Sequence, residues 1–595
     1  MMCGIIACRV TTDATPYLVS GLERLEYRGY DSAGIAVSVS DGSTAVFRTT
    51  SRVSALPALA AAWEGPALGG IGVGHTRWAT HGGVCVSNAH PHQDCNRRLS
   101  VVHNGILGNA EQLTAELIRA GHSFASDVDS EILCHLIEDA LGETTELLAA
   151  VTRALRSLTG SWAFVVLDAQ TGAMVAAAHR SPLLLAESSD GVFLASDISA
   201  IADWVDQFRI VGDGDIVEVA ESVTWTHGGK PVAAPAAIDR PPRVVDSRPL
   251  DRGDHMVSEI DEQPEVTARL LDVVGRRIAN GALWRELGIA PFERLRLLAC
   301  GTSLNAGEVI GMALSRLGGL PFTLVVASEA ADSVVEPGTL TLAISQSGET
   351  ADVLRAVEEG PADGSVVALV NNIHSTLART AGVVLGCSAG EEVGVAATKT
   401  FVCQVLVGTG LVISAMAEFG RISRSRARDL VDDLYGLPDR LAAASAAAHE
   451  ALPSIVTEVR SASGFIFLGR GSGVPYAREG ALKLKELSYR WAEAYPAGEL
   501  KHGPLALIEE GTPVVVVDNG DPRLLGNLAE ARARGGRIFS VGRSGGRIEI
   551  PLSALAPCGP LEAVVPLQLL ALDLAQSLGF DADKPRNLAK SVTVD

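Results

Sequence analysis

The pattern of apolar and polar positions changes partway along the chain. Residues 1–225 alternate short apolar runs, such as SWAFVVLD at 161–168, with two stretches of helical periodicity at 110–120 and 130–141. The second helical stretch follows Asp129, which we expect to act as its N-cap. This alternation predicts a first domain of mixed strands and helices over residues 1–225.

A different pattern follows a segment rich in proline, glycine and alanine, which we interpret as a linker at 226–250. An apolar strand, a turn of small residues and a helix recur in that order, first from residue 295 and again from residue 464. This repetition predicts two doubly wound α/β domains, in which ligands bind beyond the carboxyl ends of the strands. The predicted divisions are a first α/β domain at 251–440, a second at 441–580 and a C-terminal tail at 581–595.

Composition excludes several classes of protein. The chain has 595 residues, 47% of them hydrophobic, and a net charge of −21. It is therefore too long for one core, and too acidic to present an overall footprint for nucleic acid or an anionic membrane. A phosphate ligand would have to be held locally, by hydroxyls, amides and helix ends.

The cysteines and the N-terminus indicate a cytoplasmic location. The nine cysteines contain no CxxC pair, which argues for a reducing compartment and against structural disulfides or zinc. The N-terminus lacks a basic region followed by a long apolar one, so we expect no signal peptide. Residues 401–417 are the best membrane-span candidate, but their length and polar residues favour a buried helix.

Candidate chemistry in the first domain begins at Cys3, although a cysteine near a terminus is ordinarily unremarkable. Asn104 and Gly105 follow an apolar run and could form an oxyanion hole; taken alone, the pair favours a hairpin turn. Five histidines raise the question of a metal, but their spacing matches no common zinc pattern, and we favour structural roles for His75, His81, His90, His92 and His103.

Two turns of the first α/β domain suit a phosphosugar. Residues 345–350 place hydroxyls and amides between an apolar strand and a helix, and residues 300–303 occupy the equivalent turn of the preceding strand. Either turn alone could be simple helix capping. Two such turns on neighbouring strands favour a phosphosugar site.

Lysine is scarce, and its placement is informative. Only seven of the 49 basic residues are lysines, and five of the seven fall in four candidate site motifs: Lys399, Lys483, Lys485, Lys501 and Lys590. A primary amine can form an imine with a ketose, whereas a guanidinium cannot. Lys483 also belongs to a helical face with Glu479, Glu486 and Arg490, whose simplest interpretation is a solvated ion-pair face.

Several motifs carry a resemblance to a known family. Residues 3–5, 24–34, 75–82, 88–92 and 103–105 resemble glutamine amidotransferases with an N-terminal nucleophile, and more closely the glucosamine-6-phosphate synthase family. The resemblance covers nearly the whole chain in order, and residues 585–594 match the C-terminal signature of that family. It implies an α+β glutaminase domain with an αββα sandwich, followed by two sugar-isomerase (SIS) domains.

The resemblance also implies roles for individual residues. Cys3 would attack glutamine with its own α-amine as base, and Asn104 and Gly105 would stabilise the oxyanion. Lys590 would form the Schiff base with fructose 6-phosphate, Glu486 would move a proton between C1 and C2, His502 would assist ring opening, and Lys483 would stabilise charge. The implied glutamine-binding set is Arg77, Trp78, Thr80, His81 and Asp129, and the implied sugar-phosphate set is Thr302, Ser303, Ser345, Gln346, Ser347, Thr350, Val395 and Ala397.

The expected activity is therefore glutamine-dependent formation of glucosamine 6-phosphate, with ammonia passing between two sites. The family implies a homodimer and neither a metal nor an organic cofactor. Two departures matter: Met1 and Met2 precede Cys3, so we expect translation to start at Met2, and Ala397 stands where the family usually has serine. Further changes at 328–331, Arg490, Trp491 and Pro496 leave open a paralogue that aminates another sugar phosphate, or a phosphosugar-binding regulator.

Overall fold

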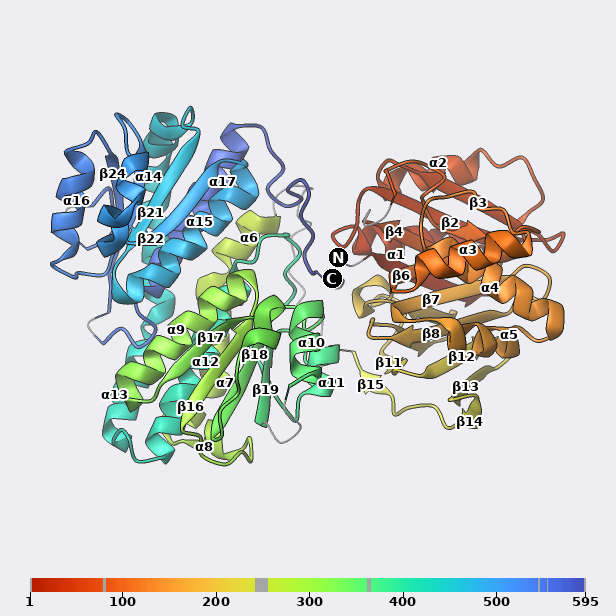
Figure 1. The fold of residues 1–595 in the computed structure, drawn as a ribbon, viewed down its shortest axis with the longest axis horizontal. Coiled ribbons are helices and arrows are strands. Elements are labelled where there is room, and N and C mark those ends of the chain that lie inside the picture. The colour runs from red at the N-terminus through yellow and green to blue at the C-terminus, as the bar shows by residue number, and fades with distance from the viewer. Residues whose placement is uncertain are drawn as a thin grey trace. The chain divides into compact units, whose positions relative to one another are not determined.

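A computed structural model describes residues 3–78, 82–240, 255–360, 365–543, 546–553 and 555–592. The chain divides into two compact units (Figure 1), one comprising residues 1–245 with 589–595 and the other residues 246–588. Each unit is described by itself below.

The first unit contains two antiparallel sheets. The eight-stranded sheet has the order β15-β11-β9-β10-β1-β4-β2-β3, and the seven-stranded sheet has the order β14-β13-β12-β8-β7-β6-β5. The strands are β1 Gly4–Val10, β2 Ser32–Val39, β3 Thr44–Thr49, β4 Leu68–Arg77, β5 His92–Gln93, β6 Leu99–Leu107, β7 Gly160–Asp168, β8 Met174–His179, β9 Leu184–Glu187, β10 Gly191–Ala195, β11 Gln207–Ile210, β12 Asp215–Val219, β13 Val223–His227, β14 Lys230–Val232 and β15 Ile238–Asp239.

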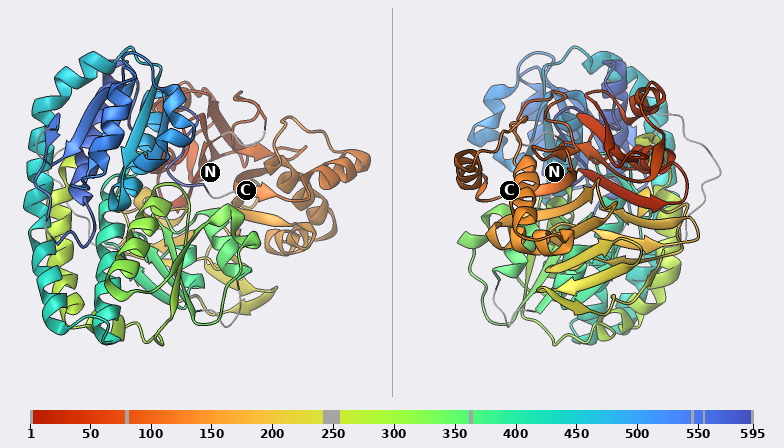
Figure 2. Two further views of the ribbon diagram at one scale, coloured as in Figure 1. Left: turned by 60° about the vertical axis from the view of Figure 1, so that its left-hand side comes forward. Right: turned by 90° about the vertical axis from the view of Figure 1, so that its right-hand side faces the viewer.

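Helices cover the outer face of each sheet, giving the four layers that the resemblance implied (Figure 2). Apolar side chains of α1 (Thr15–Leu25) and α2 (Leu56–Ala61) pack on the first sheet. Those of α3 (Ala110–Ala120), α4 (Ser130–Glu143) and α5 (Leu147–Ala154) pack on the second. A third buried cluster joins the facing sides of the two sheets. The strand predicted at 161–168 is β7. Its sequence is a nearly continuous apolar run because this sheet is buried on both faces.

The second unit contains two parallel five-stranded sheets, with the orders β17-β16-β18-β19-β20 and β22-β21-β23-β24-β25. This confirms the predicted duplication. The strands are β16 Arg294–Ala299, β17 Phe322–Val326, β18 Thr339–Ser345, β19 Ser365–Val370, β20 Val383–Gly386, β21 Gly464–Gly469, β22 Trp491–Pro496, β23 Pro513–Asp518, β24 Arg537–Gly542 and β25 Ile548–Glu549.

One continuous apolar core joins the two sheets of this unit and reaches from Met256 to Ala582. Its helices are α6 His255–Asp261, α7 Gln263–Ala279, α8 Ala282–Arg285, α9 Gly301–Gly318, α10 Ala351–Glu358, α11 Thr376–Thr380, α12 Lys399–Glu418, α13 Arg424–Tyr435, α14 Leu437–Val459, α15 Val474–Ser488, α16 Leu524–Arg532 and α17 Val564–Ser577. Among the described residues, α12 alone has the length and apolarity of a membrane span, and that stretch is wholly buried in the unit. The prediction of a buried helix at 401–417 is therefore confirmed.

Three local expectations differ from the structure. The segment expected to be a linker from residue 226 instead continues the first unit, because β14 pairs with β13 and β15 pairs with β11. Asp129 precedes α4 but makes no capping hydrogen bond; its carboxylate accepts from the Leu107 N–H at 2.9 Å. Asn104 and Gly105 form neither a hairpin turn nor the end of a strand, because both lie inside β6 and pair with β7.

Candidate functional site

The register of β1 and β4 brings Cys3 to Trp78. Gly4 pairs with Thr76, so Cys3, just before β1, lies beside Trp78, just after β4. The Trp78 N–H donates to Cys3 Sγ at 3.3 Å, and the thiol lies 3.7 Å from the Trp78 carbonyl oxygen. Burial raises the pKa of the Cys3 thiol, and the Trp78 N–H partly offsets that effect. Attack by this sulfur therefore requires a base to remove its proton.

The second sheet supplies an amide to the same place. Asn104 on β6 donates from Nδ2 to the Cys3 carbonyl oxygen at 2.9 Å. His75 on β4 holds this amide, because its Nε2 lies 3.1 Å from Asn104 Oδ1 and 3.0 Å from the His103 carbonyl oxygen. Both partners are acceptors, so Nε2 carries the ring proton. Burial lowers the pKa of His75 to about 3, which keeps the ring neutral.

Gly105 follows Asn104 with φ +122°, a conformation that side-chain-bearing residues rarely adopt. A Cβ atom at this position would lie 2.1 Å from the Ser161 carbonyl oxygen, which belongs to the paired strand β7. Only glycine therefore fits here without moving the sheet. Asn104 therefore presents its side-chain amide to Cys3, and Gly105 follows it in the same strand, as an oxyanion hole built from these two residues would require.

Arg77 and Asp129 reach the edge of this site from different elements. Arg77 ends β4 and donates to the carbonyl oxygens of Gly82 and Gly83 at 3.5 and 3.4 Å. Asp129 is tied to β6 through Leu107, and the neighbouring Ser130 hydroxyl lies 2.8 Å from His103 Nδ1. The structure therefore brings Cys3 to Trp78 and Asn104. Arg77 ends β4, Gly105 follows Asn104 within β6, and Asp129 bonds to Leu107, the last residue of that strand. Thr80 and His81 lie outside the described residues.

In the second unit, the two predicted phosphate turns lie side by side. Strands β16 and β18 pair in parallel with Leu298 opposite Ala343, so their carboxyl ends meet at one edge of the sheet. Ser345 Oγ accepts from the Gly348 N–H at 3.0 Å and lies 2.9 Å from Thr350 Oγ1. Gly348 has φ +70°, which lets the turn close on itself.

The neighbouring turn opens α9. Thr302 and Ser303 stand in the first turn of this helix, and Ser303 Oγ accepts from Gln404 Nε2 of α12 at 3.1 Å. Helix N-termini favour anions because their first N–H groups have no partner within the helix. Gln346 and Ser347 are half-buried in the turn after β18, and Val395 and half-buried Ala397 precede α12.

Helix α15 connects this edge to a buried group of charges. Glu479 is fully buried and accepts from Thr302 Oγ1 at 3.0 Å and from Asn305 Nδ2 at 2.8 Å, both on α9. Lys483 is 1% exposed, and its Nζ lies 2.6 Å from Glu486 and 3.6 Å from Glu479. Burial alone would lower the pKa of Lys483, but Glu486 and Glu479 more than offset it and raise that pKa.

The interpretation of this face as a solvated ion-pair face is therefore wrong. Glu479 and Lys483 are enclosed, and Arg490 lies beyond the C-terminus of α15. The sequence did not identify Glu479 as a residue of the candidate site, because its partners Thr302 and Asn305 lie 177 and 174 residues earlier in the chain. The only sequence signal was its i, i+4 spacing from Lys483.

The remaining candidate residues differ in their exposure to solvent. His502 is exposed at the end of a short 3₁₀ helix, Ala497–His502. Lys590 is half-buried and belongs to the first unit, whereas Glu486 and His502 belong to the second. Of the other candidate lysines, Lys399 is buried and pairs with Glu262 at 2.6 Å, while Lys485 and Lys501 pair with Glu493 and Glu530.

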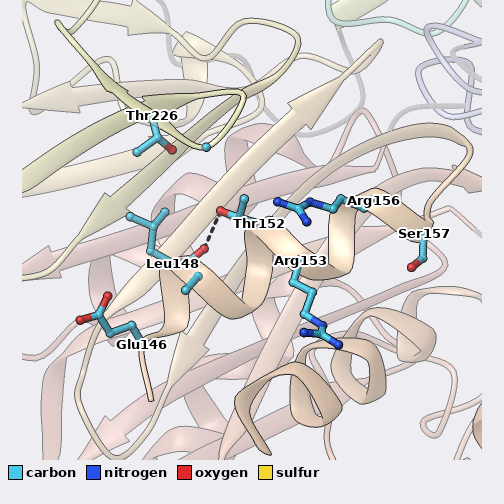
Figure 3. A pocket seen from close by; sticks show the side chains of 9 residues that line it. Glu146, Leu148, Thr152, Arg153, Arg156, Ser157 and Thr226 are labelled. Atoms are coloured by element: carbon cyan, nitrogen blue, oxygen red, sulfur yellow. Dashed lines mark hydrogen bonds between the residues drawn. The ribbon is translucent and has the colours of Figure 1, made fainter. Parts of the chain in front are cut away.

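An open hollow of about 700 Å³ lies elsewhere in the first unit (Figure 3). Residues of α5 and of the β13–β14 hairpin line it, and Thr152 uses its hydroxyl within its own helix, donating to the Leu148 carbonyl oxygen at 2.7 Å. None of the predicted site residues lines this hollow.

Comparison with known proteins identifies both units. The pattern of a glutamine amidotransferase domain matches residues 75–203, and that of the SIS domain matches residues 289–414 and 458–547. The isomerizing glutamine–fructose-6-phosphate aminotransferases of Pseudomonas syringae pv. tomato and Thermus thermophilus are each 40% identical to the chain, over the whole length of both proteins. The solved C-terminal domain of glucosamine-fructose-6-phosphate aminotransferase from Francisella tularensis is 31% identical with a TM-score of 0.51, covering 55% of this chain and 98% of its own.

Identity of this extent over the full chain, with both kinds of domain in the same order, establishes the relationship. The chain belongs to the family of isomerizing glutamine–fructose-6-phosphate aminotransferases.

Proposed function

We infer that the chain transfers the amide nitrogen of glutamine to fructose 6-phosphate and isomerises the product, giving glucosamine 6-phosphate and glutamate. The observation that carries this inference is the full-length match to relatives named for that reaction, 40% identical over 626 aligned positions for the Pseudomonas syringae protein. Ammonia would pass between the two sites, and the assembly would be a cytoplasmic homodimer.

The geometry around Cys3 supports a role in glutamine hydrolysis. In this proposal Cys3 Sγ attacks the glutamine amide carbon, and the Asn104 side-chain amide and the Gly105 N–H donate hydrogen bonds to the developing oxyanion. Arg77 and Asp129 hold the carboxylate and ammonium of glutamine, with Trp78, Thr80 and His81 around them. The base is the α-amine of Cys3, which is free only when Met1 and Met2 have been removed.

The edge formed by β16 and β18 supports a role in holding the sugar phosphate. We propose that Thr302, Ser303, Ser345, Gln346, Ser347 and Thr350 bind the phosphate and the nearby hydroxyls, with Val395 and Ala397 beside them. Lys590 supplies the amine for the imine, Glu486 transfers the proton, His502 assists ring opening, and Lys483 stabilises charge. The short Lys483–Glu486 contact supports a proton-transfer role, because it holds the carboxylate in one orientation.

The acceptor sugar is the part of the proposal that a specific observation challenges. Ala397 has no hydroxyl to offer a ligand and lies half-buried directly before Thr398 and Lys399. A paralogue that aminates another ketose phosphate is therefore the second candidate. Incubating the purified chain with glutamine and either fructose 6-phosphate or other ketose phosphates separates the two, and absence of a hexosamine product from fructose 6-phosphate would overturn the first.

Two variants test the proposed roles of Cys3 in glutamine hydrolysis and of Lys590 in amino-sugar synthesis. Cys3→Ala should abolish use of glutamine while sparing synthesis from added ammonia, because the sugar site is untouched. Lys590→Arg keeps the positive charge but cannot form an imine, so synthesis should be lost while glutamine hydrolysis remains. Near-normal amino-sugar formation by Lys590→Arg would refute the imine role. Mass spectrometry of the mature N-terminus should find Cys3 as the first residue.

A further inference from the structure

A group of metal-binding side chains lies in the first unit on three separate segments. Cys95 follows β5, His122 follows α3, and His135 and Glu138 stand one turn apart on α4. Their ligand atoms all lie within 4.8 Å of one another. We call these four residues the Cys95 cluster; none of them belongs to the glutamine or sugar-phosphate site described above.

The distances within the Cys95 cluster match those of a tetrahedral metal site. Cys95 Sγ lies 3.6 Å from His122 Nδ1 and 3.7 Å from His135 Nδ1. Glu138 Oε2 lies 3.1 Å from His122 Nδ1 and 3.2 Å from His135 Nδ1. Zinc bonds to sulfur and nitrogen at tetrahedral angles would place S and N about 3.5 Å apart and N and O about 3.3 Å apart. Four of the six distances among these atoms are thus close to those around a common centre, and all six are at most 4.8 Å.

The far side of the His122 imidazole supplies an independent indication. His122 Nε2 lies 2.8 Å from Asp139 Oδ1 and His122 Nδ1 lies 3.1 Å from Glu138 Oε2, so both ring nitrogens lie within hydrogen-bond distance of a carboxylate. A neutral imidazole has one N–H and one lone pair, and a cation at the centre would take the Nδ1 lone pair while the Nε2–H donates to Asp139. His135 Nε2 is buried and lies 3.7 Å from Glu131 Oε1, beyond hydrogen-bond distance. Histidine ligands of zinc commonly donate their other N–H to a carboxylate, as His122 does here.

We propose that Cys95, His122, His135 and Glu138 bind one divalent transition-metal ion, for which a thiolate, two imidazoles and a carboxylate favour Zn²⁺. Four protein ligands leave no open position, so the site is structural. His135 is buried and Cys95 is exposed at the rim, which gives the ion a route of entry. The ion would fasten the segment after β5 and the end of α3 to α4, whose first turn carries Ser130 and its contact with His103.

Metal analysis of the full-length chain tests this proposal. The protein is incubated with zinc, desalted and measured by elemental mass spectrometry. We expect about one zinc per chain in the wild type, and loss of most of it in Cys95→Ala and His135→Ala. Cys85→Ala and His227→Ala serve as matched controls, since both residues lie in the same unit outside the Cys95 cluster; they should retain the ion. Wild-type protein without bound zinc, or equal zinc in Cys95→Ala and Cys85→Ala, would overturn the proposal.

Cobalt substitution gives a second readout that does not depend on the folding of a variant. Co²⁺ in a tetrahedral site with one thiolate shows a sulfur-to-metal charge-transfer band and intense visible bands, which added zinc should abolish. Cys3→Ala should keep this spectrum, which separates the Cys95 cluster from the candidate nucleophile. A spectrum that is absent from the wild type, or that disappears in Cys3→Ala, contradicts the assignment. Doubly protonated His122 and His135 in zinc-treated protein, seen by NMR at neutral pH, would show an ion-pair network in place of a metal site.

Discussion

Replacement of Glu479 tests how α15 supports the sugar-phosphate site. Its carboxylate accepts hydrogen bonds from Thr302 and Asn305 and lies 3.6 Å from Lys483, with no exposure to solvent. Glu479→Ala removes all three contacts. Deleting one partner of a buried ion pair costs about 3–5 kcal/mol, and because Lys483 keeps Glu486 we expect the lower end, about 3 kcal/mol.

The magnitude can be checked by thermal unfolding. A unit of about 340 residues unfolds with an entropy of about 0.7 kcal/mol/K, so a loss of 3 kcal/mol lowers its Tm by about 4 °C. Glu308→Ala is the matched control, because Glu308 also joins α9 to α15 through an ion pair with Arg478, whose side chain is 41% exposed. We expect this control to lose less than about 1 kcal/mol.

Glu479→Gln separates hydrogen bonding from charge. Burial raises the pKa of Glu479 above its ordinary value of 4.5, so the folded chain holds this proton more tightly than the unfolded chain does. The resulting stabilisation is complete below the ordinary pKa and is lost as the pH rises through the raised folded pKa. Glutamine has no such proton to lose, so the stability of Glu479→Gln relative to the wild type should increase across that pH window.

Enzyme kinetics of Glu479→Ala test whether Glu479 also supports binding of the sugar phosphate. Without Glu479, the Thr302 hydroxyl is no longer held, so KM for the sugar phosphate should rise about tenfold in Glu479→Ala, equivalent to about 1.4 kcal/mol. Glutamine hydrolysis measured without sugar should be unchanged. Equal Tm losses in Glu479→Ala and Glu308→Ala, or an unaltered KM in Glu479→Ala, would refute the reasoning.

Two further predictions concern the glutamine site. Gly105→Ala should abolish glutamine-dependent synthesis and cost about 1–3 kcal/mol through backbone strain alone, because a Cβ atom would meet the Ser161 carbonyl oxygen at 2.1 Å; ammonia-dependent synthesis should persist, and its loss would contradict a local effect. His75→Gln should lower kcat for glutamine hydrolysis about tenfold by loosening the Asn104 amide. Since the pKa of His75 is lowered to about 3, the ring is neutral above roughly pH 4, and the wild-type pH profile between pH 5 and 8 should show no inflection that His75→Gln removes.

Local sequence patterns were sufficient for much of the fold. The strand at 161–168 and the helices at 110–120 and 130–141 appear within a few residues of their predicted limits, because apolar periodicity reports which side of an element is buried. The repeated order of strand, small-residue turn and helix likewise identified the duplicated parallel sheets. These features depend on neighbours along the chain.

Other features depend on residues far apart in sequence. The local sequence of Asn104 and Gly105 favours a turn, but both residues pair with β7 inside β6, and this pairing leaves room only for glycine at position 105. The spacing of charged residues along α15 favours a face exposed to solvent. In the structure, packing of α15 against α9 instead buries Glu479 and Lys483.

The Cys95 cluster is the clearest example of a feature that local sequence does not predict. His122 and His135 follow Cys95 by 27 and 40 residues, and the sequence has no CxxC pair, whose absence argued against zinc. The sequence by itself thus determined the elements, their repetition and the family motifs. Only the tertiary structure decided which polar groups share a buried space, because burial and electrostatic partners are set by sheet register and helix packing between distant segments.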